Sequence, residues 1–214
     1  WRVIFLGYRT HGYLQHVMGR ETFLAPVQWE KGSWPVVNKN GTVQINMDCK
    51  TLPQVKLPKD PETDDFSQTK LAWCWSYLCN PVFENYSLTE RKGYLHMKAS
   101  EKTIDQVGTL TFIGRRQTEP RFQATTAIDV SSLKEGEEAG ITAYAAHTNH
   151  YDVVVECRGG KKYVKAYIRI GQVRHVEKKI SLNTDLIYLR IEGDYNYYHL
   201  SYSEDNHRFL PSGK

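Results

Sequence analysis

The sequence predicts an all-β protein whose main domain is an antiparallel β-sandwich. The dominant hydrophobic period is two residues, and it is clearest in segments 139–157 and 161–170, where β-branched and aromatic residues alternate with polar ones. Glycine-rich turns separate these runs, and no window longer than about ten residues has helical periodicity. Many short strands joined by such turns are typical of a sandwich or a barrel, and a long series of hairpins with one polar face favours two packed sheets.

The individual strands follow from the turns between them. Arg158-Gly159-Gly160-Lys161 joins the two clearest runs, because paired glycines supply the positive φ angles of a tight hairpin. Gly193-Asp194 predicts a second turn of this kind. Further strands are predicted at residues 94–99, 109–116, 121–130, 172–180, 186–192 and 195–203.

The first quarter of the chain has a different organisation. Residues 1–47 contain glycines scattered among aromatic, strand-like segments, and they are predicted to form a separate structural part. Prolines at 53, 58 and 61 then block regular structure, which predicts a linker over residues 48–62 and a sandwich over 63–214. The chain opens on Trp1 in what reads as the middle of a strand, so we expect further sequence upstream.

Composition narrows the classes of protein and of partner. With 214 residues and 40% apolar side chains, the chain can build a core without disulfides or metals. The net charge of +4 comes from 28 basic and 24 acidic residues without a long basic run, which predicts no nucleic-acid partner. No stretch approaches the roughly 18 apolar residues of a membrane span. Cytoplasmic, periplasmic and secreted locations all stay open.

Catalytic and metal-binding patterns are absent from the sequence. There is no nucleophile elbow, phosphate loop or dinucleotide fingerprint. Carboxylates near turns, such as Glu135 and Glu138, are predicted to be solvated, and the group formed by His147, Asn149 and His150 is predicted to be a polar hairpin turn. The sequence therefore predicts no catalytic residue, no metal site and no cofactor, although a calcium ion held by Asp64 or Asp65 stays open.

Cysteine and aromatic residues have structural interpretations. The four cysteines match no zinc spacing and are predicted to be free thiols, with a Cys74–Cys79 bridge as the alternative. Trp73, Trp75 and Tyr77 alternate on one predicted strand face, and we interpret them as core residues and not as a platform for sugar stacking.

Three segments carry more specific patterns. Residues 12–37 include Gly-Arg-Glu-Thr at 19–22, residues 75–95 run from Trp75 to Leu95, and residues 113–118 include Gly-Arg-Arg-Gln. In this order they resemble the end of the five-bladed propeller, the opening of the C-terminal sandwich and its middle strands in glycoside hydrolase family 43 β-xylosidases. The resemblance implies a jelly-roll, concanavalin-like sandwich preceded by the last strands of a β-propeller.

The resemblance also implies what the chain lacks. The family hydrolyses β-1,4-xylosidic or arabinofuranosidic bonds with inversion, and its Asp base, Glu acid and orienting Asp lie on earlier blades with no counterpart here. The match to Arg20 implies a guanidinium that hydrogen-bonds a sugar hydroxyl at the bottom of the pocket, and the alternative is an ion pair with Glu21 or Glu30. The family's sandwich continues into a Gly-Gly-Phe-x-Gly strand that this chain does not reach, so we expect missing last strands and unpaired sheet edges.

The leading hypothesis is the C-terminal part of an inverting β-xylosidase or α-L-arabinofuranosidase. Its partners would be a xylo-oligosaccharide or arabinoside substrate and the catalytic propeller. A free-standing carbohydrate-binding module is the main alternative, and a homo-oligomer-forming structural sandwich is a third. The module would need an exposed aromatic row, for which the candidates are Tyr195, Tyr197, His199, Tyr163 and Tyr167.

Overall fold

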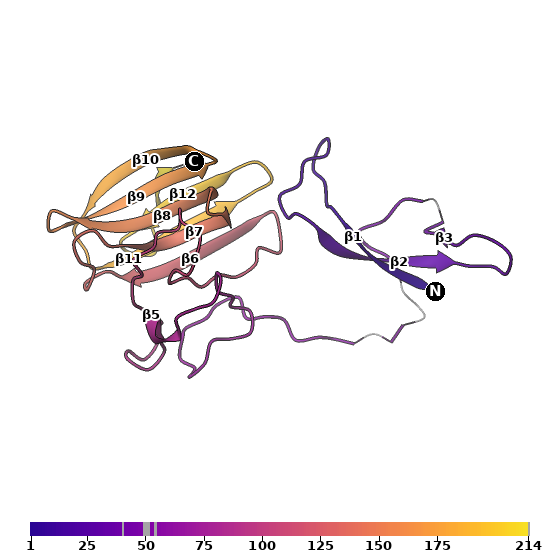
Figure 1. Ribbon diagram of the computed structural model, residues 1–214, viewed down its shortest axis with the longest axis horizontal. Helices are drawn as coiled ribbons and strands as arrows, with labels where there is room; N and C mark the ends of the chain where they lie inside the picture. Colours follow the sequence, from indigo (N-terminus) through magenta and orange to yellow (C-terminus); the bar gives the residue numbers. More distant parts are fainter. Residues whose placement is uncertain (40, 49–51, 54, 214) are drawn as a thin grey trace. The chain divides into compact units, whose positions relative to one another are not determined.

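The computed structural model describes residues 1–39, 41–48, 52–53 and 55–213, and its regular elements are almost all β-strands (Figure 1). The one helical element in this described part is a 3₁₀ turn, Phe83–Asn85. Two compact units divide the chain, Trp1–Pro61 and Glu62–Lys214. The all-β prediction is confirmed. No helix in the described ranges is long and apolar enough to cross a membrane.

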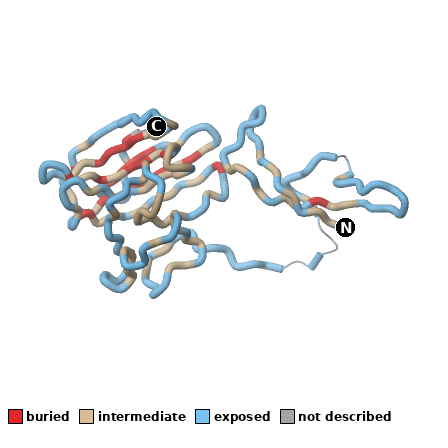
Figure 2. Tube along the Cα trace, in the orientation of Figure 1, coloured by how far each residue is buried: buried red, intermediate tan, exposed pale blue. Residues whose placement is uncertain are grey.

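The first unit is a small antiparallel sheet of three strands in the order β1-β2-β3. Its strands are β1 (Arg2–Gly7), β2 (Glu21–Gln28) and β3 (Val36–Val37). Among the described residues of this unit, Ala25 alone is buried (Figure 2). On the opposite face of the sheet, Ile4 and Leu6 are 71% and 62% exposed. The unit therefore has strands but no core of its own.

The second unit contains two four-stranded antiparallel sheets, β10-β9-β8-β7 and β13-β12-β11-β6. Their strands are β6 (Phe122–Asp129), β7 (Glu138–Ala146), β8 (Asn149–Arg158), β9 (Lys161–Ile170), β10 (Val173–Leu182), β11 (Leu186–Gly193), β12 (Tyr198–Ser203) and β13 (Leu210–Gly213). The hairpin predicted between β8 and β9 is confirmed, with φ angles of 62° and 68° at Gly159 and Gly160. The Glu135 carboxylate accepts hydrogen bonds from both of these backbone N–H groups.

Alternate residues of both sheets form one apolar core between them. In β8 the inward positions include Val153 and Val155, and their neighbours in sequence point to the outer face. The fully buried members of the core from the other strands are Val164, Ala166, Ile187, Leu189, Ile191 and Leu200. The period of two in the sequence thus corresponds to the two faces of each strand.

Strand β10 is an edge of its sheet and is interrupted by a bulge. Val176 pairs with Tyr167 and Lys178 pairs with Ala166, so Glu177 has no opposite residue on β9. The outermost strand also carries several exposed charged side chains, among them Arg174 and Lys179.

The segment between Glu62 and β6 is mostly irregular, and two predictions fail there. Of the strand predicted at residues 94–99, only the two-residue strand β5 (His96–Met97) forms, and it pairs with β4 (Tyr86–Ser87). The strand predicted at residues 109–116 does not form, and this segment contributes only an isolated bridge between Gly114 and Ser76. Side chains replace the expected backbone ladder: the Tyr86 hydroxyl donates to the Phe112 carbonyl and accepts from its N–H.

Two other predictions concern this segment and the linker that precedes it. Trp73 was expected in the core but is fully exposed, at 104%. Its neighbour Trp75 is half-buried instead, because its indole N–H donates to Asp64 at 2.7 Å. Within the predicted linker, residues 52, 53 and 55–61 form no strand or helix, whereas residues 49–51 and 54 lie outside the described residues.

Candidate functional site

Arg20 lies in the β1–β2 loop, directly before the first residue of β2. Gly19 precedes it with a φ of +70°, and the Arg20 side chain is exposed. The Glu21 carboxylate, one of the two alternative partners of Arg20, binds Arg9 Nε at 2.8 Å in the described part of the chain. Glu30, another described residue, forms no ion pair with Arg20. The guanidinium of Arg20 is thus presented at the loop end of the sheet.

The same loop carries several other hydrogen-bonding side chains. The rings of Tyr8 and His16 stack with centroids 4.3 Å apart, and the backbone N–H of His11 donates to the backbone carbonyl of Gln15 at 2.7 Å, which closes the loop near them. Guanidinium, imidazole and phenol groups can hydrogen-bond neutral hydroxyls without placing a net negative charge beside them. This loop end is therefore chemically suited to a hydroxyl-rich ligand.

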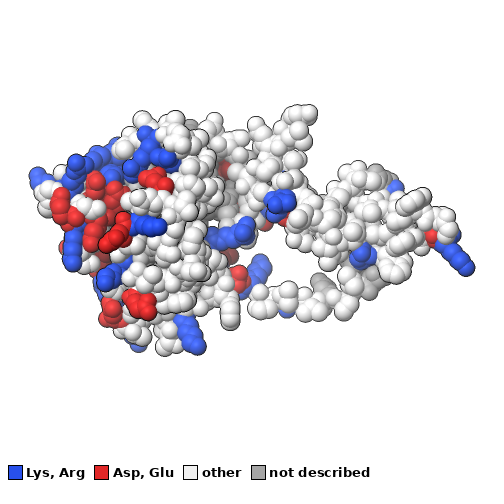
Figure 3. Space-filling model, in the orientation of Figure 1, with Lys and Arg blue, Asp and Glu red and all other residues white. Residues whose placement is uncertain are grey.

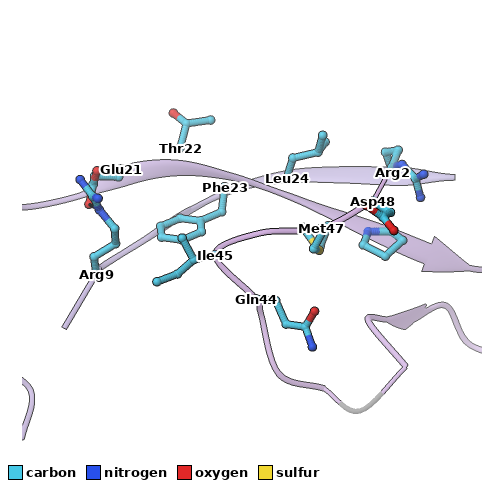
Figure 4. Close-up of a pocket in the computed structure, with 12 residues that line it drawn as sticks. Arg2, Arg9, Glu21, Thr22, Phe23, Leu24, Gln44, Ile45, Met47 and Asp48 are labelled. Atoms are coloured by element: carbon cyan, nitrogen blue, oxygen red, sulfur yellow. Dashed lines mark hydrogen bonds and ion pairs between the residues drawn. The ribbon is translucent and has the colours of Figure 1, made fainter. Parts of the chain in front are cut away.

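A hollow of about 300 Å³ lies beside β2 within the first unit (Figure 4). Phe23 of β2 faces Ile45 of the following segment, while the Arg9–Glu21 pair lies at one end of the hollow and Asp48 near the other. Arg20 does not line it. Glu21 is engaged by Arg9, and Asp48 lies near the other end of the hollow, so the described lining residues offer no adjacent pair of free carboxylates of the kind that glycoside hydrolysis needs.

The carboxylates considered as calcium ligands make protein contacts. Asp64 accepts the Trp75 indole N–H and the Phe66 backbone N–H, and Asp65 accepts the Ser67 backbone N–H at 3.0 Å. The hydrogen bonds from Ser67 lower the pKa of Asp65. In the ranges that the structure describes, no three His, Cys, Asp or Glu side chains gather as a metal site. Both aspartates stabilise the start of the second unit.

The outer face of the β10-β9-β8-β7 sheet carries a network of charged side chains. Lys165 Nζ bridges two carboxylates, Glu138 at 2.7 Å and Glu156 at 3.1 Å, and Lys179 binds the other oxygen of Glu156. The Tyr167 hydroxyl donates to Glu138 at 2.6 Å. Figure 3 shows the two signs of charge interspersed on the visible face of the sandwich. A carboxylate pair neutralised in this way is structural and not an acid/base pair.

Tyr167 was a candidate for sugar stacking, and its environment excludes that role. Its side chain is 3% exposed, and the Arg174 guanidinium lies 4.7 Å from its ring centroid. Burial, followed by the nearby charge of Glu138, raises the pKa of its hydroxyl. Tyr163, also on β9, has Lys179 Nζ 4.2 Å from its ring centroid. Both rings already contact cations of the protein.

The other members of the predicted aromatic row belong to the second sheet, with Tyr195 and Tyr197 on the turn between β11 and β12 and His199 in β12. Tyr195 and Tyr197 are exposed, and the carboxylate of Asp194 fixes the turn by accepting the N–H groups of Asn196 and Tyr197. His199 lies beside Tyr197, with ring centroids 6.3 Å apart. The predicted row is thus split between two sheets.

His150 is a residue whose position the sequence did not reveal. The predicted hairpin turn is formed by His147 and Thr148, but Asn149 and His150 belong to β8, and His150 is fully buried. It contacts Asp152 and Asp105 on opposite sides of its ring. The alternation of side chains along β8 could have indicated this position from the sequence, because His150, Asp152 and Glu156 share one face of the strand. The cysteines described, Cys74, Cys79 and Cys157, are free thiols as predicted.

Comparison with known proteins identifies the second unit. Residues 63–214 match the model of the "Beta xylosidase C-terminal Concanavalin A-like domain". The chain is 37% identical over 163 residues to the Bacteroides ovatus "Non-reducing end alpha-L-arabinofuranosidase BoGH43B", covering 76% of this chain and 31% of that protein. It is 33% identical to the Butyrivibrio fibrisolvens "Xylosidase/arabinosidase", covering 73% and 30%.

Solved structures give the same result for the fold. The structure of "Bacteroides ovatus Xyloglucan PUL GH43B" matches with a TM-score of 0.91 and 30% identity, covering 100% of this chain and 42% of that one. The chain therefore spans less than half the length of these relatives. Its concanavalin-like sandwich, predicted from strand alternation and from the Gly-Arg-Arg-Gln block, is confirmed. The chain belongs to the family of β-xylosidase C-terminal concanavalin A-like domains, whose relatives here are glycoside hydrolase family 43 xylosidases and arabinofuranosidases.

Proposed function

We propose that this chain is the C-terminal part of an inverting glycoside hydrolase that acts on xylosides or arabinofuranosides derived from xylan. The observation that carries the proposal is the family match over residues 63–214. Relatives named as xylosidases and arabinofuranosidases are matched over about a third of their length or less. The remaining length of such an enzyme would be the catalytic propeller, and the sandwich would shape its substrate pocket.

In this proposal Arg20 binds the substrate. The Arg9–Glu21 ion pair supports the role, because it engages the carboxylate that follows Arg20 in the sequence, and the side chain of Arg20 is exposed. Five N–H donors in fixed geometry suit two adjacent sugar hydroxyls better than a flexible ammonium would. Arg20 would thus position the sugar ring without taking part in proton transfer.

The chemistry itself would come from carboxylates outside this chain. An inverting enzyme needs a general acid and a general base about 6.5–9.5 Å apart, with room for a water between them. The carboxylates described above are occupied instead: Glu21 by Arg9, Glu138 by Lys165 and Tyr167. We therefore expect the 214-residue chain to be inert alone and to support catalysis when joined to a propeller.

The test measures hydrolysis of aryl β-xyloside and aryl α-arabinofuranoside. The chain alone should release no aryl alcohol above buffer, whereas a chimera carrying the preceding part of the Bacteroides ovatus relative should turn over one of the two substrates. In that chimera, Arg20→Ala should lower kcat/KM by roughly 10- to 1000-fold, the expected loss for a hydrogen bond from a charged group in a desolvated pocket.

Arg158→Ala is the matched control, since Arg158 is exposed in the β8–β9 turn of the sandwich. It should leave kcat/KM unchanged. Turnover by the chain alone would show that a catalytic carboxylate pair lies within these residues. Equal activity of the Arg20→Ala chimera and its parent would instead contradict only the proposed role of Arg20, and not the proposal that the chain is part of a glycoside hydrolase.

A carbohydrate-binding module is the second candidate, and the exposed Tyr195 and Tyr197 on their anchored turn favour it. Calorimetric titration of the chain with xylo-oligosaccharides distinguishes the two. Binding that is lost in Tyr197→Ala would support the module, and a flat isotherm would reject it.

A further inference from the structure

An irregular loop of the second unit, residues 100–111, is closed on itself by side chains. At its base the Thr111 N–H donates to Ser100 Oγ at 3.2 Å, and Thr111 Oγ1 donates to the Lys98 carbonyl at 2.7 Å. At its tip, the Gln106 N–H donates to the Thr103 carbonyl, so that Asp105 lies inside a tight turn. The base would keep its shape if the tip moved, because the two sets of hydrogen bonds are separate.

The loop tip is held on the sheet by one carboxylate. Asp105 meets a cationic group from each of three adjacent strands: His150 of β8 at 3.2 Å, Arg169 of β9 at 3.8 Å and Arg174 of β10 at 3.7 Å. Its side chain is only 17% exposed. No backbone ladder joins this loop to the sheet, so these contacts are the main attachment of the tip.

His150 connects this attachment to a second, fully buried carboxylate. Its Nδ1 lies 2.5 Å from Asp152 Oδ2, and its Nε2 lies 3.2 Å from Asp105 Oδ1. A neutral imidazole has one N–H and can donate to only one of these two acceptors, whereas the imidazolium donates to both. The contacts on both sides of the ring are therefore satisfied only when His150 is charged.

The surroundings favour the charged form of the ring. Burial alone would lower the pKa of His150, but the hydrogen bond and charge of Asp152, followed by Asp105, raise it above its ordinary value. The titratable and charged groups around the ring come from every element packed against it: Tyr144 of β7, Asp152 of β8, Tyr167 and Arg169 of β9, Arg174 of β10 and Asp105 of the loop.

Among the basic and phenolic groups around it, only the imidazole changes charge near neutral pH. The arginines stay protonated at any ordinary pH, and burial raises the pKa of the hydroxyl groups of Tyr144 and Tyr167 away from neutrality.

We propose that the 100–111 loop is a pH-dependent strap, which is held on the outer face of the β10-β9-β8-β7 sheet by Asp105 while His150 is an imidazolium, and which loosens when that proton leaves. The pKa of His150 is higher in the closed state of the strap than in the open state. The charge of His150 therefore stabilises the closed state fully below about pH 6.5, and this stabilisation is lost as the pH rises through the pKa of the closed state.

Two buried oxygens lie on the same face of the sheet as His150. Thr142 and Asp152 pair directly across β7 and β8, and neither Thr142 Oγ1 nor Asp152 Oδ1 has a hydrogen-bond partner among the described residues. Burying two oxygens without hydrogen-bond partners costs free energy in the closed state.

Hydrogen–deuterium exchange of the full 214-residue chain tests the strap, with rates divided by the intrinsic rate at each pH. Protection of amides in residues 100–111 should fall by up to about tenfold per pH unit between about pH 6.5 and the pKa of His150 in the closed state, and then level off, while protection of β8 and β11 stays constant. Asp105→Asn should lower protection of the loop by about tenfold at pH ~6 and abolish the pH dependence. Asp185→Asn, which removes an exposed ion pair with Lys162, is the matched control and should keep the wild-type profile.

A spectroscopic measurement on the unmodified chain keeps the test independent of variant folding. Nitrogen-15 NMR should show both ring nitrogens of His150 protonated at pH ~6.5, where an unperturbed histidine is about half neutral. A neutral tautomer of His150 below pH ~6.5, or loop protection that does not change between pH ~6 and pH ~9, would overturn the proposal.

Discussion

The two units of this chain both form antiparallel strands from alternating sequence, yet only one of them forms a core. Among the described residues of the first unit only Ala25 is buried, and Ile4 and Leu6 face solvent. In the second unit two sheets enclose a continuous set of fully buried aliphatic residues, including Leu189. Alternation is thus sufficient to make strands, but a stable unit also needs a second layer against which to bury one face.

The two units should differ most in how much stability they lose when a leucine is replaced by alanine. Leu189→Ala removes a fully buried side chain between the sheets and should lower the free energy of unfolding by about 2–5 kcal/mol. Leu24→Ala, at a position 39% exposed in the first unit, should change it by less than about 1 kcal/mol. Urea denaturation followed by fluorescence measures both. A large loss from Leu24→Ala would mean that the first unit is stabilised by burial that its own sheet does not provide.

Removing a tyrosine hydroxyl should also change the stability of the two units by different amounts, but the difference should be smaller. Tyr167→Phe removes the donor to the Glu138 carboxylate on the buried outer face and should cost about 1.5–3 kcal/mol, since this hydrogen bond involves a charged acceptor. Tyr13→Phe in the first unit changes a side chain that is 89% exposed and should cost nothing measurable. Similar thermal midpoints for the two variants would show that the network on the sheet contributes little to stability.

Removing an ion pair should give the smallest difference in stability between the two units. Arg91 binds Asp129 across 38 residues and lowers the pKa of that carboxyl to about 2, with help from Ser131. Asp129→Asn should therefore cost up to about 1 kcal/mol above pH ~4, and this cost should disappear as the pH falls through about 2, where Asp129 itself is protonated.

Glu21→Gln is the corresponding change in the first unit, where it removes the local pair with Arg9. It should leave the unfolding of the sandwich unaffected at every pH. A cost of Asp129→Asn that persists unchanged to pH ~2 would rule out the ion pair as its source.

The sequence predicted the parts of the fold in which each strand contacts its neighbour along the chain. Segments 139–157 and 161–170 became the β7–β8–β9 hairpins, because alternation and the Gly159-Gly160 turn act over short distances. Prediction failed at 94–99 and 109–116, where Tyr86 and Thr111 satisfy backbone groups that a ladder would otherwise pair. β-branched composition alone does not reveal such substitutes.

The candidate sites divide in the same way. Arg20 was found through a four-residue pattern, and its exposed position directly before β2 agrees with a binding role that stays a prediction. The Asp105–His150 contact joins residues 45 positions apart, and no local pattern marks it. Tyr167 looked like a binding platform because its ring alternates outward, but the ring is buried and the guanidinium of Arg174 from the neighbouring strand lies over it.

The bulge in β10 also determines how molecules of this chain can meet. A second chain adding to that edge as a new strand would lose its register at Glu177, and it would have to bury Arg174 and Lys179 against its own side chains. Strand-by-strand growth from this edge therefore stops after a few residues. We therefore expect the β10 edge to oppose fibril formation at high concentration.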